Sequence, residues 1–132
     1  MDYKLVILTA LDYKKCGRLE SGRIYMHMQE IIPLDEFVSF MAKFEGGVAE
    51  FVETRGRIRG NIGSISSDQT LVTVSISPAV RRHFGEWIPY GRAERSVFEP
   101  WFIVKDGERV VIMTRDADDL VILYPKGVLQ AI

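Results

Sequence analysis

The chain has 132 residues, of which 47% are hydrophobic and 27% charged, and its formal net charge at pH 7 is −1. These values are close to the average of globular proteins, so they exclude a disordered or a fibrous chain. The length is that of one domain, and we predict a single domain over residues 1–132.

The first half of the chain shows strand patterns and one helical pattern. Residues 4–10 are apolar on both alternating faces, as in a strand buried on both sides, and residues 23–31 alternate as in a half-buried strand. Pro33 suits a first helical turn, and apolar residues then repeat at helical spacing until Gly46-Gly47 ends the helix. The apolar residues within 48–54 fit the spacing of a strand and also that of a helix, and we favour a strand there.

The second half begins with a strand in which Val72, Val74 and Ile76 face one way. Ser77 can cap a second short helix, with Pro78 at its first position and residue 85 at its end. Together these patterns predict an α+β fold with a mainly antiparallel sheet and two short helices.

Residues 101–113 predict a hairpin that turns at Asp106-Gly107, which would pair Lys105 with Glu108 and Val104 with Arg109. Both faces of this hairpin are largely apolar, and this predicts a homodimer in which a second subunit covers one of them. Residues 120–124 form a short apolar run that fits a strand or a helix equally well.

No segment predicts contact with a membrane. The longest apolar runs, residues 5–8 and 120–124, are far shorter than the roughly 20 residues that cross a bilayer. The first residues include Asp2, and the apolar stretch behind them lacks the cleavage site of a secretory signal. We therefore expect a cytoplasmic protein. Because Asn61 is the only asparagine and Arg outnumbers Lys by 11 to 6, the composition also suggests a thermophile or its virus.

No motif for catalysis or cofactor binding stands out. Cys16 is the only cysteine, which excludes a multi-cysteine zinc site, and neither His27 nor His83 has a recognisable catalytic partner. The glycines near residue 60 match neither a P-loop nor a dinucleotide fingerprint. The acids of residues 116–119 could bind a hard cation, but acids in loops are usually helix caps or solvated charge. We therefore predict no catalytic residue, no metal and no cofactor.

One segment carries a positive charge that the whole chain lacks. Between residues 55 and 95 there are seven arginines, no lysine and three acids, in a chain of net charge −1. Arginine binds phosphate in a bidentate manner and stacks on bases, and aromatic residues lie among these arginines. The predicted nucleic-acid-binding residues are Arg55, Arg57, Arg59, Arg81, Arg82, Trp87, Tyr90, Arg92 and Arg95.

The spacing of Arg55, Arg57 and Arg59 would place all three side chains on one face of an extended segment. The alternative is that the arginines form surface ion pairs in a thermostable protein while Trp87 and Tyr90 lie in the core. The sequence fits both interpretations.

Residues 70–85 and 102–112 resemble the AbrB/MazE family of swapped-hairpin DNA-binding domains. In that family a strand leads into a short helix of pattern Pro-x-x-apolar-Arg-x-x-Leu-Gly, followed by a hairpin. Val80, Arg81, Phe84 and Gly85 fall at matching places, and Pro78 stands one position after the family's proline. The resemblance implies an intertwined homodimer that presents basic residues to DNA.

These observations predict a non-catalytic protein that binds DNA, single- or double-stranded. Two alternatives stay open at this point. The first is a structural, self-assembling protein such as a minor virion component, and the second is a small hydrolase that uses the acids from Asp116 to Asp119.

Overall fold

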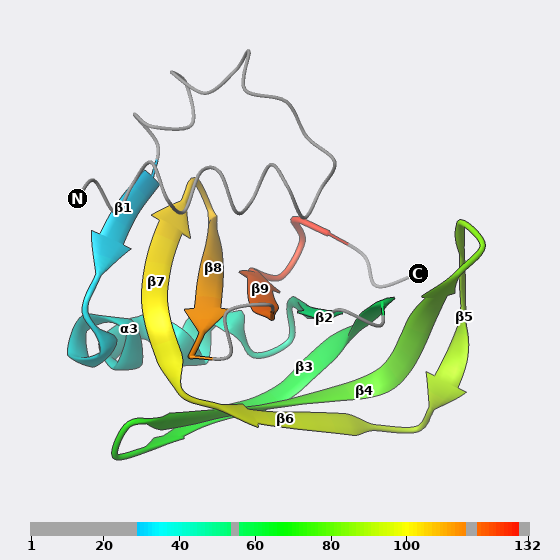
Figure 1. Cartoon of the computed structure of the whole chain (residues 1–132), viewed down its shortest axis with the longest axis horizontal. Helices are drawn as coiled ribbons and strands as arrows, with labels where there is room; N and C mark the ends of the chain where they lie inside the picture. The colour runs from blue at the N-terminus through cyan, green and yellow to red at the C-terminus, as the bar shows by residue number, and fades with distance from the viewer. Residues whose placement is uncertain (1–28, 54–55, 116–118, 130–132) are drawn as a thin grey trace.

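The computed structural model describes residues 29–53, 56–115 and 119–129, which form one antiparallel sheet of nine strands and one helical segment (Figure 1). The strand predicted over residues 4–10 lies outside this part of the chain. Within it, no helix has the length and apolar character that crossing a membrane requires. The elements are β1 (Gln29–Ile32), α3 (Leu34–Phe40), η2 (Met41–Phe44), β2 (Val48–Glu53), β3 (Gly56–Asp68), β4 (Leu71–His83), β5 (Glu86–Gly91), β6 (Glu94–Phe98), β7 (Pro100–Asp106), β8 (Arg109–Thr114) and β9 (Leu120–Tyr124).

The strand order is β1-β7-β8-β9-β2-β3-β4-β5, and β6 pairs with β4 beside β5. One edge of β4 pairs with β3, while its other edge is shared by β6, at Val72–Ile76, and by β5, at Ala79–His83. The chain passes from β6 at this end of the sheet directly into β7 near the opposite end, so the sheet curls round its core (Figure 1).

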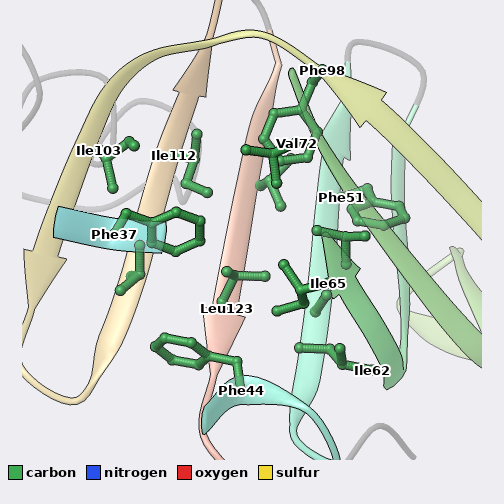
Figure 2. Close-up of a cluster of buried hydrophobic side chains, with 14 of the residues drawn as sticks. Phe37, Phe44, Phe51, Ile62, Ile65, Val72, Phe98, Ile103, Ile112 and Leu123 are labelled. Atoms are coloured by element: carbon green, nitrogen blue, oxygen red, sulfur yellow. The ribbon is translucent and has the colours of Figure 1, made fainter. Parts of the chain in front are cut away.

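The core has two parts, one on each face of the central strands. On one face, the helical segment contributes Phe37 and Phe44, both fully buried, which pack near Ile112 and Leu123 (Figure 2). On the other face, a second cluster contains six buried residues: Val52, Val104, Val111, Met113, Leu120 and Ile122. Strands β7, β8 and β9 therefore bury side chains on both faces, as the apolar character of their sequences requires.

The predicted helix after Pro33, its end at Gly46-Gly47 and the strand after it are confirmed by α3, η2 and β2. Residues 120–124, which fitted either type, form the strand β9.

The predicted second helix is wrong, and with it the α+β fold class with two short helices. Residues 78–83 continue strand β4, because strand pairing satisfies their backbone groups: Ala79 to Arg81 pair with β3 on one edge, and Ala79 to His83 pair with β5 on the other. The register between β3 and β4 shifts so that Ser77 and Pro78 together lie opposite Asn61. Such a bulge accommodates a proline inside a strand, and the same Ser-Pro pair suggested a helix start in the sequence.

The hairpin of β7 and β8 is confirmed, but its predicted turn lies one residue too early, so each predicted partner is wrong by two positions. Asp106 pairs with Arg109, so the two-residue turn is Gly107-Glu108 and Val104 pairs with Val111. Asp106 is buried and accepts hydrogen bonds from Arg109, with Nη2 2.6 Å from Oδ2, which fixes this pair as the last of the ladder. Burial by itself lowers the pKa of the Arg109 guanidinium group. The interactions of this group with Asp106 and Tyr124 outweigh burial, so the pKa is raised.

Both faces of this hairpin are buried within one chain: Val104 is 1% exposed and Ile112 is fully buried. The hairpin thus needs no second subunit to cover it, and the reason for predicting a homodimer no longer applies.

Two glycines of β3 allow a test of the β3–β4 packing. A Cβ atom at Gly60 would lie 2.6 Å from the carbonyl oxygen of Pro78, whereas a Cβ at Gly63 would meet nothing closer than 3.9 Å. We expect Gly60→Ala to lower the free energy of unfolding by about 1–3 kcal/mol. Gly63→Ala is the matched control and should leave stability unchanged or raise it by about 0.5 kcal/mol. Urea denaturation measures both, and equal effects would contradict the close approach of β3 and β4.

Candidate functional site

Eight of the nine predicted site residues lie in the described part of the chain, and Arg55 lies outside it. They sit on neighbouring strands at one end of the sheet, but they do not form one surface. One face carries Arg57, Arg59, Arg82 and Trp87, the opposite face carries Arg81 and Tyr90, Arg92 follows β5 and Arg95 lies on β6.

The most prominent feature of this end is a hairpin formed by residues 79–91 of β4 and β5, here called the arm. Its strands pair from Ala79 with Gly91 to His83 with Glu86. The described pairing of β3 with β4 ends at Ile58 and Arg81, so the tip of the arm extends past it. Figure 1 shows the arm at the right, projecting away from the rest of the sheet. A projecting two-stranded ribbon offers both of its faces and its tip to a partner.

At the base of the arm, two of the predicted arginines are bound to a buried carboxylate. Glu50 of β2 is 2% exposed, and it lies opposite Arg59 in the β2–β3 ladder. Arg59 donates to Oε1 of Glu50 from Nε at 3.1 Å and from Nη2 at 2.6 Å. Nη1 of Arg57 lies 3.3 Å from the other carboxylate oxygen. Arg57 and Arg59 do share one face, as their spacing predicted, but Glu50 offsets part of their charge.

The ring of Trp87 lies against two guanidinium groups. The Cζ atoms of Arg59 and Arg82 are 4.4 Å and 5.4 Å from its ring centroid. These cation–π contacts connect β3, β4 and β5 side by side, because Trp87 pairs with Arg82 across the arm. The tryptophan, which lies near the tip, therefore holds the arm to β3 through Arg59, and the two guanidinium groups limit the access of a nucleic-acid base to its ring.

The other face of the arm is more open. Arg81 is exposed, its Cζ lies 5.8 Å from the ring centroid of Tyr90, and Tyr90 is 43% exposed. Arg81 and Tyr90 also line a cavity of about 420 Å³, together with Glu53, Gly56, Arg57, Ile58 and Asp119. Two arginines and two carboxylates share this cavity, so it lacks the uniform positive charge that would favour a phosphate.

Asp119 is the one member of the acidic stretch 116–119 that the structure describes, and Asp116 and Asp118 lie outside. Among the described residues no group of three or more His, Cys, Asp or Glu side chains is placed to hold a metal ion.

The tip of the arm carries Phe84, which lies in the segment predicted as the second helix and is not among the predicted site residues. Phe84 and Gly85 form the two-residue turn between β4 and β5, with positive φ angles of 49° and 82°, respectively. Turns of this type favour Asn-Gly or Gly-Gly, and a bulky side chain is strained there. Phe84 is also 93% exposed, and its ring contacts that of His83 edge-on at 4.4 Å. No turn signal in the sequence marks Phe84, because phenylalanine is rare at this position.

Comparison with known proteins gives no match to a family model, to a curated protein or to a solved structure. The resemblance of residues 70–85 and 102–112 to the AbrB/MazE family therefore stays a prediction. Residues 78–85, which were aligned with the short helix of that family, form part of β4 and the turn after it. The proposals below depend on the geometry of the arm and not on this resemblance.

The ion pairs at Glu50 can be tested by their effect on stability. We expect Arg59→Met to lower the free energy of unfolding by about 1–3 kcal/mol, because it removes two hydrogen bonds from a buried carboxylate. Adding Glu50→Gln to this variant should recover part of the loss, since the buried charge is then removed as well. A double-mutant cycle in urea measures the coupling, and additive effects would mean that the pair is not formed.

For the strained turn at Phe84 we expect a substitution that increases stability. Phe84→Asn introduces a residue that tolerates positive φ and creates the preferred Asn-Gly turn. It should raise the free energy of unfolding by about 1 kcal/mol, as expected from relief of an unfavourable left-handed conformation. Thermal unfolding compares the variant with the wild type. A clear loss of stability would show that Phe84 supports the fold through contacts with the rest of the chain.

Proposed function

We propose that this chain is a non-catalytic, cytoplasmic protein that binds nucleic acid through the β4–β5 arm. The observation that carries the proposal is the arm itself: a projecting ribbon that carries both exposed arginines and exposed aromatic rings. Arg81 and Arg82 are exposed next to the tip, and Tyr90 and Phe84 expose their rings on the same ribbon. Guanidinium groups bind phosphate oxygens, and aromatic rings stack on bases, so both parts of a nucleotide find a partner here.

The distribution of charge supports the arm more than the strand β3 as the site of phosphate contacts. Arg57 and Arg59 form ion pairs with the buried carboxylate of Glu50. Moving either arginine to a phosphate would deprive that carboxylate of one of its positively charged partners. Arg81 and Arg82, by contrast, reach solvent, and so do Arg92 and Arg95 at the adjoining β5–β6 connection and β6. The exposed cations therefore follow the arm and its junction with β6.

A second candidate function is self-assembly into a homodimer or a larger structure. It is favoured by the open edges of the sheet, since β1 and β5 are its two ends and each pairs on one edge in the described chain. Val97 of the neighbouring β6 is 56% exposed and Ile88 of β5 is 37% exposed. An exposed strand edge with apolar side chains is a site where a second chain can add a strand. Sedimentation at micromolar concentration distinguishes a dimer from a monomer.

The salt dependence of binding tests the nucleic-acid proposal. We expect the double variant Arg81→Gln/Arg82→Gln to weaken binding to all sequences alike. It should also flatten the plot of log K against log salt by about 1.8 on duplex or about 1.4 on single-stranded oligonucleotides, because two phosphate contacts are lost. Fluorescence anisotropy at several salt concentrations measures affinity and slope together.

The matched control is Lys43→Gln/Lys126→Gln, which removes the same number of positive charges. Lys43 lies on η2 and Lys126 lies beside Gly46 at the end of that segment, away from the arm. The control should leave the salt slope nearly unchanged. Equal slopes for the two double variants would exclude the arm as the contact, and a wild-type protein that binds no oligonucleotide at low salt would refute the proposed function.

A further inference from the structure

We infer that Phe84 is the residue that stacks on the nucleic acid, and that it stacks on an unpaired base. This inference rests on the proposed function and names the chemistry of its site. Three observations carry it: the strained backbone of Phe84, the exposure of its ring, and the way in which the other aromatic rings of the arm are already engaged.

The backbone shows that phenylalanine is a costly choice at this position. Phe84 has a φ of 49° in a two-residue turn whose second residue, Gly85, has a φ of 82°. Asparagine or glycine at position 84 would form the same turn without strain. A strained residue that persists at an exposed position suggests a role in contact with a partner.

The ring of Phe84 contributes little to the fold that would offset this strain. It is 93% exposed, and the ring contact that the structure shows for it is the edge-on approach to His83, at 4.4 Å with an interplanar angle of 71°. An exposed aromatic ring at the end of a projecting ribbon is free to lie flat against a base, since every base has an aromatic face.

The other rings of the arm are less available. Trp87 lies against the guanidinium groups of Arg59 and Arg82, and Arg81 lies near the ring of Tyr90. Phe84 differs from both in its position and in its much larger exposure. Arg81 and Arg82 precede Phe84 on β4, and they can hold phosphates next to a base that stacks on the tip.

An unpaired base fits this tip better than insertion between the base pairs of a duplex. Insertion requires unstacking and bending of the duplex, which proteins compensate by many additional contacts to its backbone. The arm carries two arginines and one glutamate, and the whole chain has a net charge of −1. So few cations give little compensation for bending, whereas stacking on a base that is already unpaired requires none.

The experiment measures binding of the full chain to fluorescein-labelled single-stranded oligothymidine, to the matching duplex and to that duplex with one unpaired thymidine. The variants are Phe84→Asn, which keeps the turn and removes the ring, and Phe84→Trp, which keeps an aromatic ring. We expect Phe84→Asn to bind the single strand and the bulged duplex about tenfold more weakly, with an unchanged salt slope, because stacking and not charge is lost. Phe84→Trp should restore binding, and its fluorescence should be quenched by the oligonucleotide.

Each other outcome contradicts a different statement. If Phe84→Asn binds as tightly as the wild type while Arg81→Gln/Arg82→Gln does not, the arm binds nucleic acid and the inference about Phe84 is wrong. If Phe84→Asn weakens binding to the perfect duplex as much as to the single strand, the ring does not select unpaired bases. If the wild type binds none of the three probes at low salt, the proposed function and this inference are both refuted.

Discussion

Backbone pairing along both edges of β4 is the interaction on which the remaining structure depends. This strand holds β3 on one edge along most of its length, and on its other edge it holds β6 and then β5. Loss of the pairing with β6 would release β6 and the start of β7 from the sheet. Loss of the pairing with β5 would open the arm. The sheet and the candidate site are therefore parts of one hydrogen-bonded ladder, and the bulge at Ser77 and Pro78 marks the division between them.

The same ladder explains which parts of the fold could be predicted from the sequence. The helix after Pro33 has local signals at both ends, namely a proline at its start and two glycines after it, and there these signals predicted the structure correctly. The segment after Ser77 has equally good local signals, but neighbouring strands that are distant in sequence determine its structure. The register of the β7–β8 hairpin depends on the buried pair of Asp106 and Arg109, which a turn dipeptide does not reveal.

The candidate site shows a similar division. The spacing of Arg57 and Arg59 correctly placed them on one face of a strand, because that follows from the two-residue period alone. Their partner, Glu50, belongs to another strand, and only the register of β2 with β3 brings it opposite Arg59. The sequence therefore located the positive segment without separating the arginines that stabilise the sheet from those that reach solvent. Phe84 was misplaced for the same reason as the second helix, since its exposure depends on the turn that β4 and β5 form.

Because β6 and β5 pair with separate parts of β4, the length of the arm can change without a change in the packing of the core. The residues of the arm tip, from Arg82 to Trp87, lie past the described pairing of β3, and the buried apolar residues of the arm, Ala79 and Val80, lie at its base. Insertion of two residues into each strand near the tip would move the apex outward by about 7 Å and would keep every other side chain on its present face. Related chains could thus acquire arms of different reach by small insertions while the sheet stays the same. The arm is the part of this fold in which evolution can change the distance to a partner without repacking the interior.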